Sequence, residues 1–143
     1  MPFVYTDANK LQGQEKVGSG DCVDLVKHFV PGLNSLSARV CWRPGARVID
    51  TRTLARGTAI ATFTNDRYPN GNTGQHAALF LAHAGPNSFW VMDQWRGKKA
   101  ISKRLIYGPR PGIKQRPDGS WPDASNVGPA FSVIELSCGR GAK

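Results

Sequence analysis

The stretch that decides the fold is Gly18-Ser19-Gly20-Asp21-Cys22-Val23-Asp24-Leu25-Val26-Lys27. Its glycines favour a flexible turn, and Ser19 or Asp21 can cap the helix that follows. Apolar residues then recur at helical spacing until Pro31-Gly32, which cannot continue a helix. The pattern therefore predicts a helix over residues 21–30 with a cysteine in its first turn.

In this position Cys22 can be either a nucleophile or a residue of the core. The partial positive charge at a helix N-terminus and its free backbone amides favour a thiolate, and the same amides can donate to an oxyanion. A cysteine can equally be a small hydrophobic residue of the core. Position alone does not choose between nucleophile and core residue.

Length and composition indicate one globular domain over residues 1–143. The hydrophobic fraction is 40% and the charged fraction 20%, and no apolar run reaches the roughly 20 residues of a membrane helix. The first residues lack the basic and then apolar pattern of a secretory signal. We therefore expect a protein made in the cytoplasm, which would need another export route to act elsewhere.

The chain is strongly basic, with a formal net charge of +9 and a pI of about 10.0. This favours polyanionic partners such as nucleic acid, anionic lipid or an anionic wall polymer. A run of basic residues contains no acid, although for each member a solvated surface position is the simpler interpretation. The run consists of Arg96, Lys98, Lys99, Lys103, Arg104, Arg110, Lys114 and Arg116. No nucleic-acid-binding motif accompanies the charge, so a nucleic-acid-binding module is the weaker alternative.

The three cysteines are Cys22, Cys41 and Cys138. They form no Cys-x-x-Cys pair, and no His-x(3–5)-His spacing accompanies them, so we expect no zinc site and no metal or cofactor. The odd count leaves one thiol free, and Cys22 is the natural candidate. A Cys41–Cys138 disulfide is a possible pairing that nothing in the sequence supports.

The rest of the chain predicts an α+β fold in which the Cys22 helix packs on a mostly antiparallel sheet. Residues 8–15 favour a short helix, and residues 31–57 look irregular or loosely helical, with a turn at Arg43-Pro44-Gly45. Four or five strands are expected within residues 58–63, 76–81, 89–95, 100–107 and 130–136. The strand over residues 76–81 is almost entirely apolar, so we expect it to be central and covered on both faces.

His76 is the histidine that best fits a general base for Cys22, because it is a polar residue at the mouth of an apolar strand. A hairpin centred near Gly85-Pro86 pairs Ala78 with Asp93, which makes Asp93 a diagonal neighbour of His76 on the same face. A shift of one residue would separate the two onto opposite faces. The alternatives are a hydrogen-bonded core histidine and an aspartate that only begins a turn.

Two loops offer further candidates for substrate binding. The loop over residues 64–74 precedes His76, and its Arg67 and Tyr68 could meet a substrate carboxylate. The loop over residues 108–129 is unusually long, so it is either a lid whose Trp121 stacks on a sugar or a segment that Trp121 anchors to the sheet.

Four motifs occur in the order and spacing of the CHAP and NlpC/P60 superfamily. They are Gly20-Asp21-Cys22-Val23-Asp24-Leu25-Val26, Gly57-Thr58-Ala59-Ile60-Ala61-Thr62-Phe63, Gly74-Gln75-His76-Ala77-Ala78-Leu79-Phe80-Leu81 and Val91-Met92-Asp93-Gln94-Trp95. Members of the superfamily are papain-like cysteine peptidases and amidases that cut bacterial peptidoglycan. The chain resembles its small single-domain proteobacterial members over about residues 18–105, and some of their relatives are amidase effectors of type VI secretion.

The resemblance implies a papain-like fold with Cys22 as nucleophile, His76 as general base and Asp93 as the third polar residue. CHAP domains usually have Glu followed closely by Asn at the third site, so the resemblance leaves open whether Asp93 acts alone or Gln94 shares its role. Gln94 is also a candidate for substrate binding. Papain-like enzymes also place an upstream polar side chain at the oxyanion hole. Candidates for that side chain are Gln12, Gln14 and Tyr5.

The implied activity is hydrolysis of a peptidoglycan amide bond by acyl transfer. The implied setting is export by a dedicated secretion system to the periplasm, with an immunity protein as a possible partner. A papain-like protease or deamidase that acts on a protein is the remaining alternative.

Overall fold

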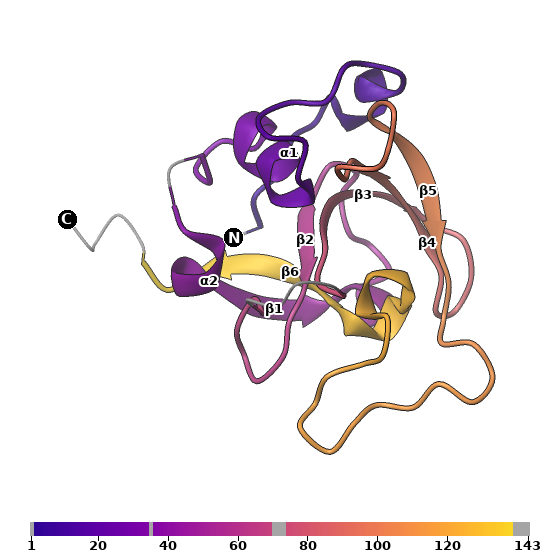
Figure 1. The fold of residues 1–143 in the computed structure, drawn as a ribbon. Coiled ribbons are helices and arrows are strands. Elements are labelled where there is room, and N and C mark those ends of the chain that lie inside the picture. The colour runs from indigo at the N-terminus through magenta and orange to yellow at the C-terminus, as the bar shows by residue number, and fades with distance from the viewer. Residues whose placement is uncertain (1, 35, 70–73, 139–143) are drawn as a thin grey trace.

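A six-stranded antiparallel sheet is the centre of the computed structural model, which describes residues 2–34, 36–69 and 74–138 (Figure 1). The strand order is β1-β6-β2-β3-β4-β5, and neighbouring strands are antiparallel throughout. The strands are β1 (Trp42–Arg47), β2 (Ala59–Thr62), β3 (Ala77–His83), β4 (Phe89–Asp93), β5 (Ser102–Ile106) and β6 (Phe131–Leu136). The helices are α1 (Cys22–Phe29) and α2 (Ala38–Cys41), with short 3-10 turns at Ala8–Leu11, Val48–Asp50, Ala124–Asn126 and Gly128–Ala130. The expected α+β class is confirmed.

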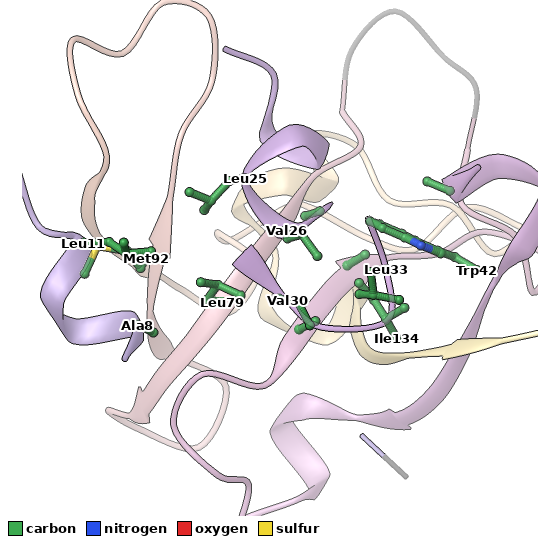
Figure 2. Close-up of a cluster of buried hydrophobic side chains, with 14 of the residues drawn as sticks. Ala8, Leu11, Leu25, Val26, Val30, Leu33, Trp42, Leu79, Met92 and Ile134 are labelled. Atoms are coloured by element: carbon green, nitrogen blue, oxygen red, sulfur yellow. The ribbon is translucent and has the colours of Figure 1, made fainter. Parts of the chain in front are cut away.

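The two faces of the sheet carry separate apolar clusters. On one face Leu25 and Val26 of α1 are completely buried in a cluster that includes Leu79 and Met92 (Figure 2). The opposite cluster includes Phe80 of β3 together with residues of β4, β5 and β6. Each fully buried side chain of this size contributes about 1.5–3 kcal/mol of transfer free energy. Strand β3 is therefore central and covered on both faces, as its apolar sequence predicts.

Residues 42–47 depart from the sequence prediction. Arg43-Pro44-Gly45 was expected to form a turn, yet it lies within β1, which pairs with β6 at the edge of the sheet. An edge strand needs hydrogen bonds on one side only, so it tolerates proline, and an irregularity in the β1–β6 register follows Pro44. The helix expected over residues 8–15 is shortened to the 3-10 turn Ala8–Leu11, and Gly13 follows it at a φ of 85°.

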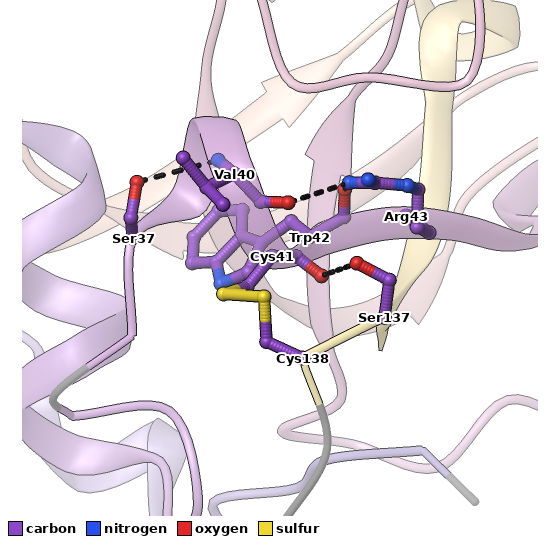
Figure 3. The surroundings of a disulfide bond; sticks show 7 residues. All are labelled: Ser37, Val40, Cys41, Trp42, Arg43, Ser137 and Cys138. Atoms are coloured by element: carbon purple, nitrogen blue, oxygen red, sulfur yellow. Dashed lines mark hydrogen bonds between the residues drawn. A yellow bond between two sulfur atoms is a disulfide. The ribbon is translucent and has the colours of Figure 1, made fainter. Parts of the chain in front are cut away.

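A disulfide joins Cys41, the last residue of α2, to Cys138 (Figure 3). The two cysteines are 97 residues apart in sequence, but the β1–β6 register brings their Cα atoms within 4.9 Å. That register pairs Trp42 with Leu136, so the residues just before β1 and just after β6 are neighbours. The pairing depends on a long-range strand contact, which is why the sequence offers no local sign of it.

The loop over residues 108–129 extends away from the end of β5 (orange in Figure 1) before the chain returns as β6. Within the described ranges, no helix is both long enough and apolar enough to cross a lipid bilayer. The described residues also contain no group of three or more His, Cys, Asp or Glu side chains placed to hold a metal ion.

Candidate active site

His76 and Asp93 lie together on one face of the sheet. The Nε2 atom of His76 is 2.7 Å from Oδ2 of Asp93, and the two residues are 4% and 0% exposed. Leu79 pairs with Met92, which puts Ala78 opposite Asp93, as the hairpin argument predicts. The register that makes these two side chains diagonal neighbours is therefore confirmed.

A β-bulge produces this register. Near the turn, His83 pairs with Phe89, and between Phe80 and the following residues the register shifts by one position. Without the bulge, Asp93 would point to the opposite face from His76, because successive side chains on a strand alternate between faces. The bulge therefore decides whether the two side chains can meet.

Strand β2 holds the backbone of His76. The His76 amide donates to Oγ1 of Thr62 at 3.0 Å, and the Thr62 amide donates to the His76 carbonyl at 2.9 Å. The imidazole is further enclosed by edge-on contacts with the rings of Trp95 and Phe131, at centroid distances of 6.2 and 6.5 Å. These contacts restrict the imidazole to the orientation in which Nε2 meets Asp93.

Cys22 is the first residue of α1 and lines the same cavity as His76, whose imidazole lowers the pKa of the thiol. Because Nε2 of His76 is engaged by Asp93, Nδ1 is the ring nitrogen left for the thiol. The Tyr68 hydroxyl lies 3.8 Å from the Cys22 sulfur. These groups line a cavity of about 620 Å³ whose wall also includes Trp95 and Arg39.

The surroundings of Cys22 and His76 favour a thiolate–imidazolium pair. Burial opposes ionisation of the thiol, but the His76 hydrogen bond and charge, the Ala77 amide and the Tyr68 hydroxyl together hold the pKa of Cys22 below its ordinary value. Burial also opposes protonation of His76, yet Asp93 and Cys22 raise the pKa of its imidazole. The same burial and the neighbouring thiolate raise the pKa of Tyr68, so its hydroxyl keeps its proton.

Asp93 is buried beneath three positively charged or protonatable groups. Lys98 Nζ lies 2.6 Å from Oδ1, and Arg104 Nε and His76 Nε2 lie 2.9 and 2.7 Å from Oδ2. Burial opposes ionisation of this carboxyl, but His76, Arg104 and Lys98 together hold its pKa far below the ordinary range. The indole of Trp95 covers the group, with Lys98 Nζ at 4.7 Å and the Arg104 guanidinium at 5.4 Å from its ring centre.

The sequence analysis missed the roles of Lys98 and Arg104. It treated both as solvated surface cations, whereas their side chains are only 14% and 18% exposed. The β4–β5 register could have revealed Arg104, because it places Ser102 opposite Asp93 and Arg104 diagonally beside it.

Gln94 lies beneath the chain entering α1 rather than in the cleft. It is 0% exposed, accepts from the Val17 amide at 3.0 Å and donates to the carbonyls of Val17 and Asp21 at 3.0 and 2.7 Å. The expectation that Gln94 binds substrate or shares the role of Asp93 therefore disagrees with its position. Its contacts hold the segment from Val17 to Asp21, which directly precedes Cys22.

Of the loop residues proposed to bind substrate, Tyr68 lies at the thiol. Arg67 is exposed and is not among the described residues that line the cavity containing Cys22. Trp121 lines a separate cavity of about 420 Å³, together with Phe63 and Pro129. Their positions give Arg67 and Trp121 no direct contact with the thiol.

None of the three upstream oxyanion-hole candidates is near Cys22. Gln12 accepts from the Lys103 amide, Gln14 donates to the Lys10 carbonyl, and Tyr5 packs on Phe29 at the far end of α1. Other donors are available at the thiol.

The N-terminus of α1 has free amides. The Asp21 side chain, at the N-cap, makes no capping bond and pairs with Arg96 at 2.7 Å. Among the described residues, the backbone amides of Cys22 and Val23 have no hydrogen-bond partner. These amides and the Tyr68 hydroxyl are therefore the donors nearest to the sulfur that can receive a developing negative charge.

Comparisons with known proteins show which proteins this chain resembles. Residues 3–119 match the family model described as domesticated amidase effector 2. The type VI secretion amidase effector 2 protein of Salmonella typhi is 40% identical over 139 residues, which cover 94% of this chain and 100% of the relative. The domesticated amidase effector 2 of Ixodes scapularis is 31% identical over 106 residues, covering 72% of this chain and 71% of the relative.

A solved structure, described as type 6 secretion amidase effector 2, shares the fold. It superimposes with a TM-score of 0.84 at 40% identity, and the match covers 96% of each chain. The chain therefore belongs to the domesticated amidase effector 2 family.

Proposed function

We propose that residues 1–143 form a cysteine amidase domain that hydrolyses an amide bond of bacterial peptidoglycan. Cys22 is the nucleophile, His76 is the general acid and base, and Asp93 orients His76. The observation that supports this most strongly is that the helix-terminal thiol shares a cavity with an imidazole that is hydrogen-bonded to a buried carboxylate. The relation to the CHAP and NlpC/P60 superfamily is part of the same proposal.

In the first step, the Cys22 thiolate attacks the amide carbonyl carbon. The carbonyl oxygen becomes an oxyanion, which the free amides of Cys22 and Val23 and the Tyr68 hydroxyl stabilise by donating hydrogen bonds. Tyr68 can serve in this way because it remains protonated, and its ring packs edge-on against buried Trp42 at 5.3 Å.

In the second step, the His76 imidazolium gives its proton to the leaving amine, and the C–N bond breaks to leave a thioester on Cys22. Neutral His76 then takes a proton from water, which attacks the thioester and releases the acid and the thiolate. Asp93 stabilises each imidazolium stage through its 2.7 Å contact. Lys98 and Arg104 keep Asp93 ionised and in position.

The relatives' names also support a proposal about where the enzyme acts. Two of the matched proteins are named as type VI or type 6 secretion effectors, so we extend delivery by that system to this chain. Export would bring the enzyme to the periplasm of a target cell, where the net charge of +9 favours an anionic wall. An immunity protein in the producing cell is the corresponding partner.

Digestion of purified peptidoglycan, followed by mass spectrometry of the fragments, tests the assignment and names the bond that is cut. Wild-type protein should release fragments that carry a new amine and a new carboxylate, while Cys22→Ala lowers the rate by at least about 10³-fold. His28→Ala is the matched control, because His28 is an exposed histidine on the same helix and should leave the rate unchanged. Cleavage that survives Cys22→Ala would refute the proposal.

A further inference from the structure

Arg39 is a cation in the wall of the cleft that has no partner among the described residues. It is exposed on α2 and lines the same cavity as Cys22 and His76. Over residues 2–34, 36–69 and 74–138, no side chain or carbonyl forms a hydrogen bond or ion pair with its guanidinium. The other arginine lining this cavity, Arg96, is already paired with Asp21 at 2.7 Å.

The backbone beneath Arg39 is held firmly in place. The Ser37 hydroxyl accepts from the Val40 amide at 3.3 Å and caps α2, and the disulfide fastens Cys41 to Cys138 (Figure 3). The next residue, Trp42, is 0% exposed and packs edge-on against Tyr68. An exposed guanidinium therefore projects from a backbone whose position relative to Cys22 is restrained by covalent and packing contacts.

An unpaired guanidinium in such a place fits a carboxylate. Its planar fork of donors binds a carboxylate through two parallel hydrogen bonds, and it keeps its charge at every physiological pH. Peptidoglycan peptides carry free carboxylates in addition to the amide bonds that link their residues. A carboxylate in the cleft would meet Arg39 as its available partner, because Lys98 and Arg104 are engaged by Asp93.

We propose that Arg39 is a specificity-determining residue that binds a free carboxylate of the substrate peptide. The inference rests on the proposed function for the choice of substrate. Arg39 lies outside the Cys22–His76–Asp93 group, so its contact should be equally strong in the ground state and the transition state. Its loss should raise KM and leave kcat close to its wild-type value.

Binding of peptide fragments tests the inference separately from catalysis. Cross-linked peptides released from purified peptidoglycan are titrated calorimetrically into Cys22→Ala protein, with and without Arg39→Gln or Arg39→Lys. The same peptides are titrated again after carbodiimide and ammonia have converted their carboxylates to primary amides. Arg110→Gln is the matched control, because Arg110 is an exposed cation beside Pro86–Ser88, at the end of the β3–β4 hairpin remote from His76.

Arg39→Gln should weaken binding of the free-acid peptides about 10- to 100-fold, the usual contribution of a charge-assisted hydrogen-bonded pair. The affinity of Arg39→Lys for these peptides should lie between those of the parent and Arg39→Gln, and Arg110→Gln should bind them as tightly as the parent does. On the amidated peptides, Arg39→Gln and the parent should bind equally weakly. Alkylation of the free thiol in the Arg39→Gln single variant should proceed at the wild-type rate, which shows that Cys22 is unaffected.

The inference is overturned if Arg39→Gln binds the free-acid peptides as tightly as the parent does. It is also overturned if the variant loses the same factor on the amidated peptides, because the contact would then not involve a carboxylate. Hydrolysis of the same peptides by the wild-type protein is scored separately. Failure of that hydrolysis would contradict the proposed function, while the binding comparison would still decide the role of Arg39.

Discussion

The two walls of the cleft are held in place by different forces. The sheet wall is His76 together with Asp93, Lys98 and Arg104 behind it, and each charge in this group meets an opposite or protonatable partner within 3 Å. The α2 wall is Arg39 and Tyr68, and it is positioned by packing of Tyr68 on Trp42 and by the Cys41–Cys138 disulfide behind it.

The difference indicates that the two walls have different roles. On the sheet wall, mutual pairing sets the pKa of Cys22 and His76 and leaves no charge free for a ligand. On the α2 wall, the guanidinium of Arg39 has no partner among the described residues and remains available. We therefore expect changes to the sheet wall to act mainly on kcat, and changes to Arg39 and the disulfide of the α2 wall to act mainly on binding.

The largest effect short of removing the thiol is expected from Asp93→Asn. The amide cannot neutralise Lys98 and Arg104, so two largely buried cations lose their counter-charge, at a cost of about 3–5 kcal/mol in the free energy of unfolding. The kcat value should fall by about 10²- to 10⁴-fold, because the imidazolium loses its counter-charge. Denaturant unfolding and steady-state kinetics measure the two effects.

Adding Lys98→Gln to Asp93→Asn separates stability from catalysis. The double variant no longer buries an unpaired ammonium, so it should regain part of the lost stability and none of the activity. The pH profile gives a second check. Asp93 raises the pKa of His76, so Asp93→Asn should move the alkaline limb of the kcat/KM profile to lower pH. If the alkaline limb does not move, the charge of Asp93 does not set the pKa of His76 during catalysis.

A smaller effect is expected from Tyr68→Phe, which tests whether the α2 wall also contributes to the chemical step. Removing one oxyanion donor should lower kcat by about 10²-fold. The hydroxyl is the smallest of the contributions that lower the pKa of Cys22, so the pH dependence of thiol alkylation should move only slightly upward. Tyr107→Phe is the matched control, since Tyr107 is 58% exposed and lines a different cavity. Wild-type kcat in Tyr68→Phe would leave the backbone amides as the oxyanion donors.

The smallest effect on activity is expected from removing the disulfide by Cys41→Ala with Cys138→Ala. The bond closes a loop over a sequence separation of 97 residues, so its loss should lower the free energy of unfolding by about 2–4 kcal/mol. At 25 °C the folded variant should keep kcat within about threefold and show a higher KM, because only the α2 wall is loosened. Thermal unfolding and steady-state kinetics test both statements. A fall in kcat as large as that of Asp93→Asn would contradict the expectation that the disulfide acts mainly on binding.

Sequence reasoning was most successful where the signal is local. The apolar spacing after Cys22 and the stop at Pro31-Gly32 predicted α1 to within one residue at each end, and the apolar run after His76 predicted a strand covered on both faces. The side-chain cap expected from Ser19 or Asp21 is absent, because Asp21 pairs with Arg96 and Ser19 donates to Asp24. It failed at Arg43-Pro44-Gly45, because an edge strand accepts residues that normally mark turns. It also failed for Gln94, whose amide is used within the fold.

By itself, the sequence determined that a cysteine begins a helix, that a histidine opens a buried strand and that an aspartate lies in the next strand. Helix and strand periodicity act over a few residues, so they can be read from the chain. The tertiary structure alone decided that a bulge brings Asp93 to His76, that Lys98 and Arg104 converge on that carboxylate, and that Cys41 meets Cys138. Each of these depends on the register between strands, and register is set by packing across the whole sheet.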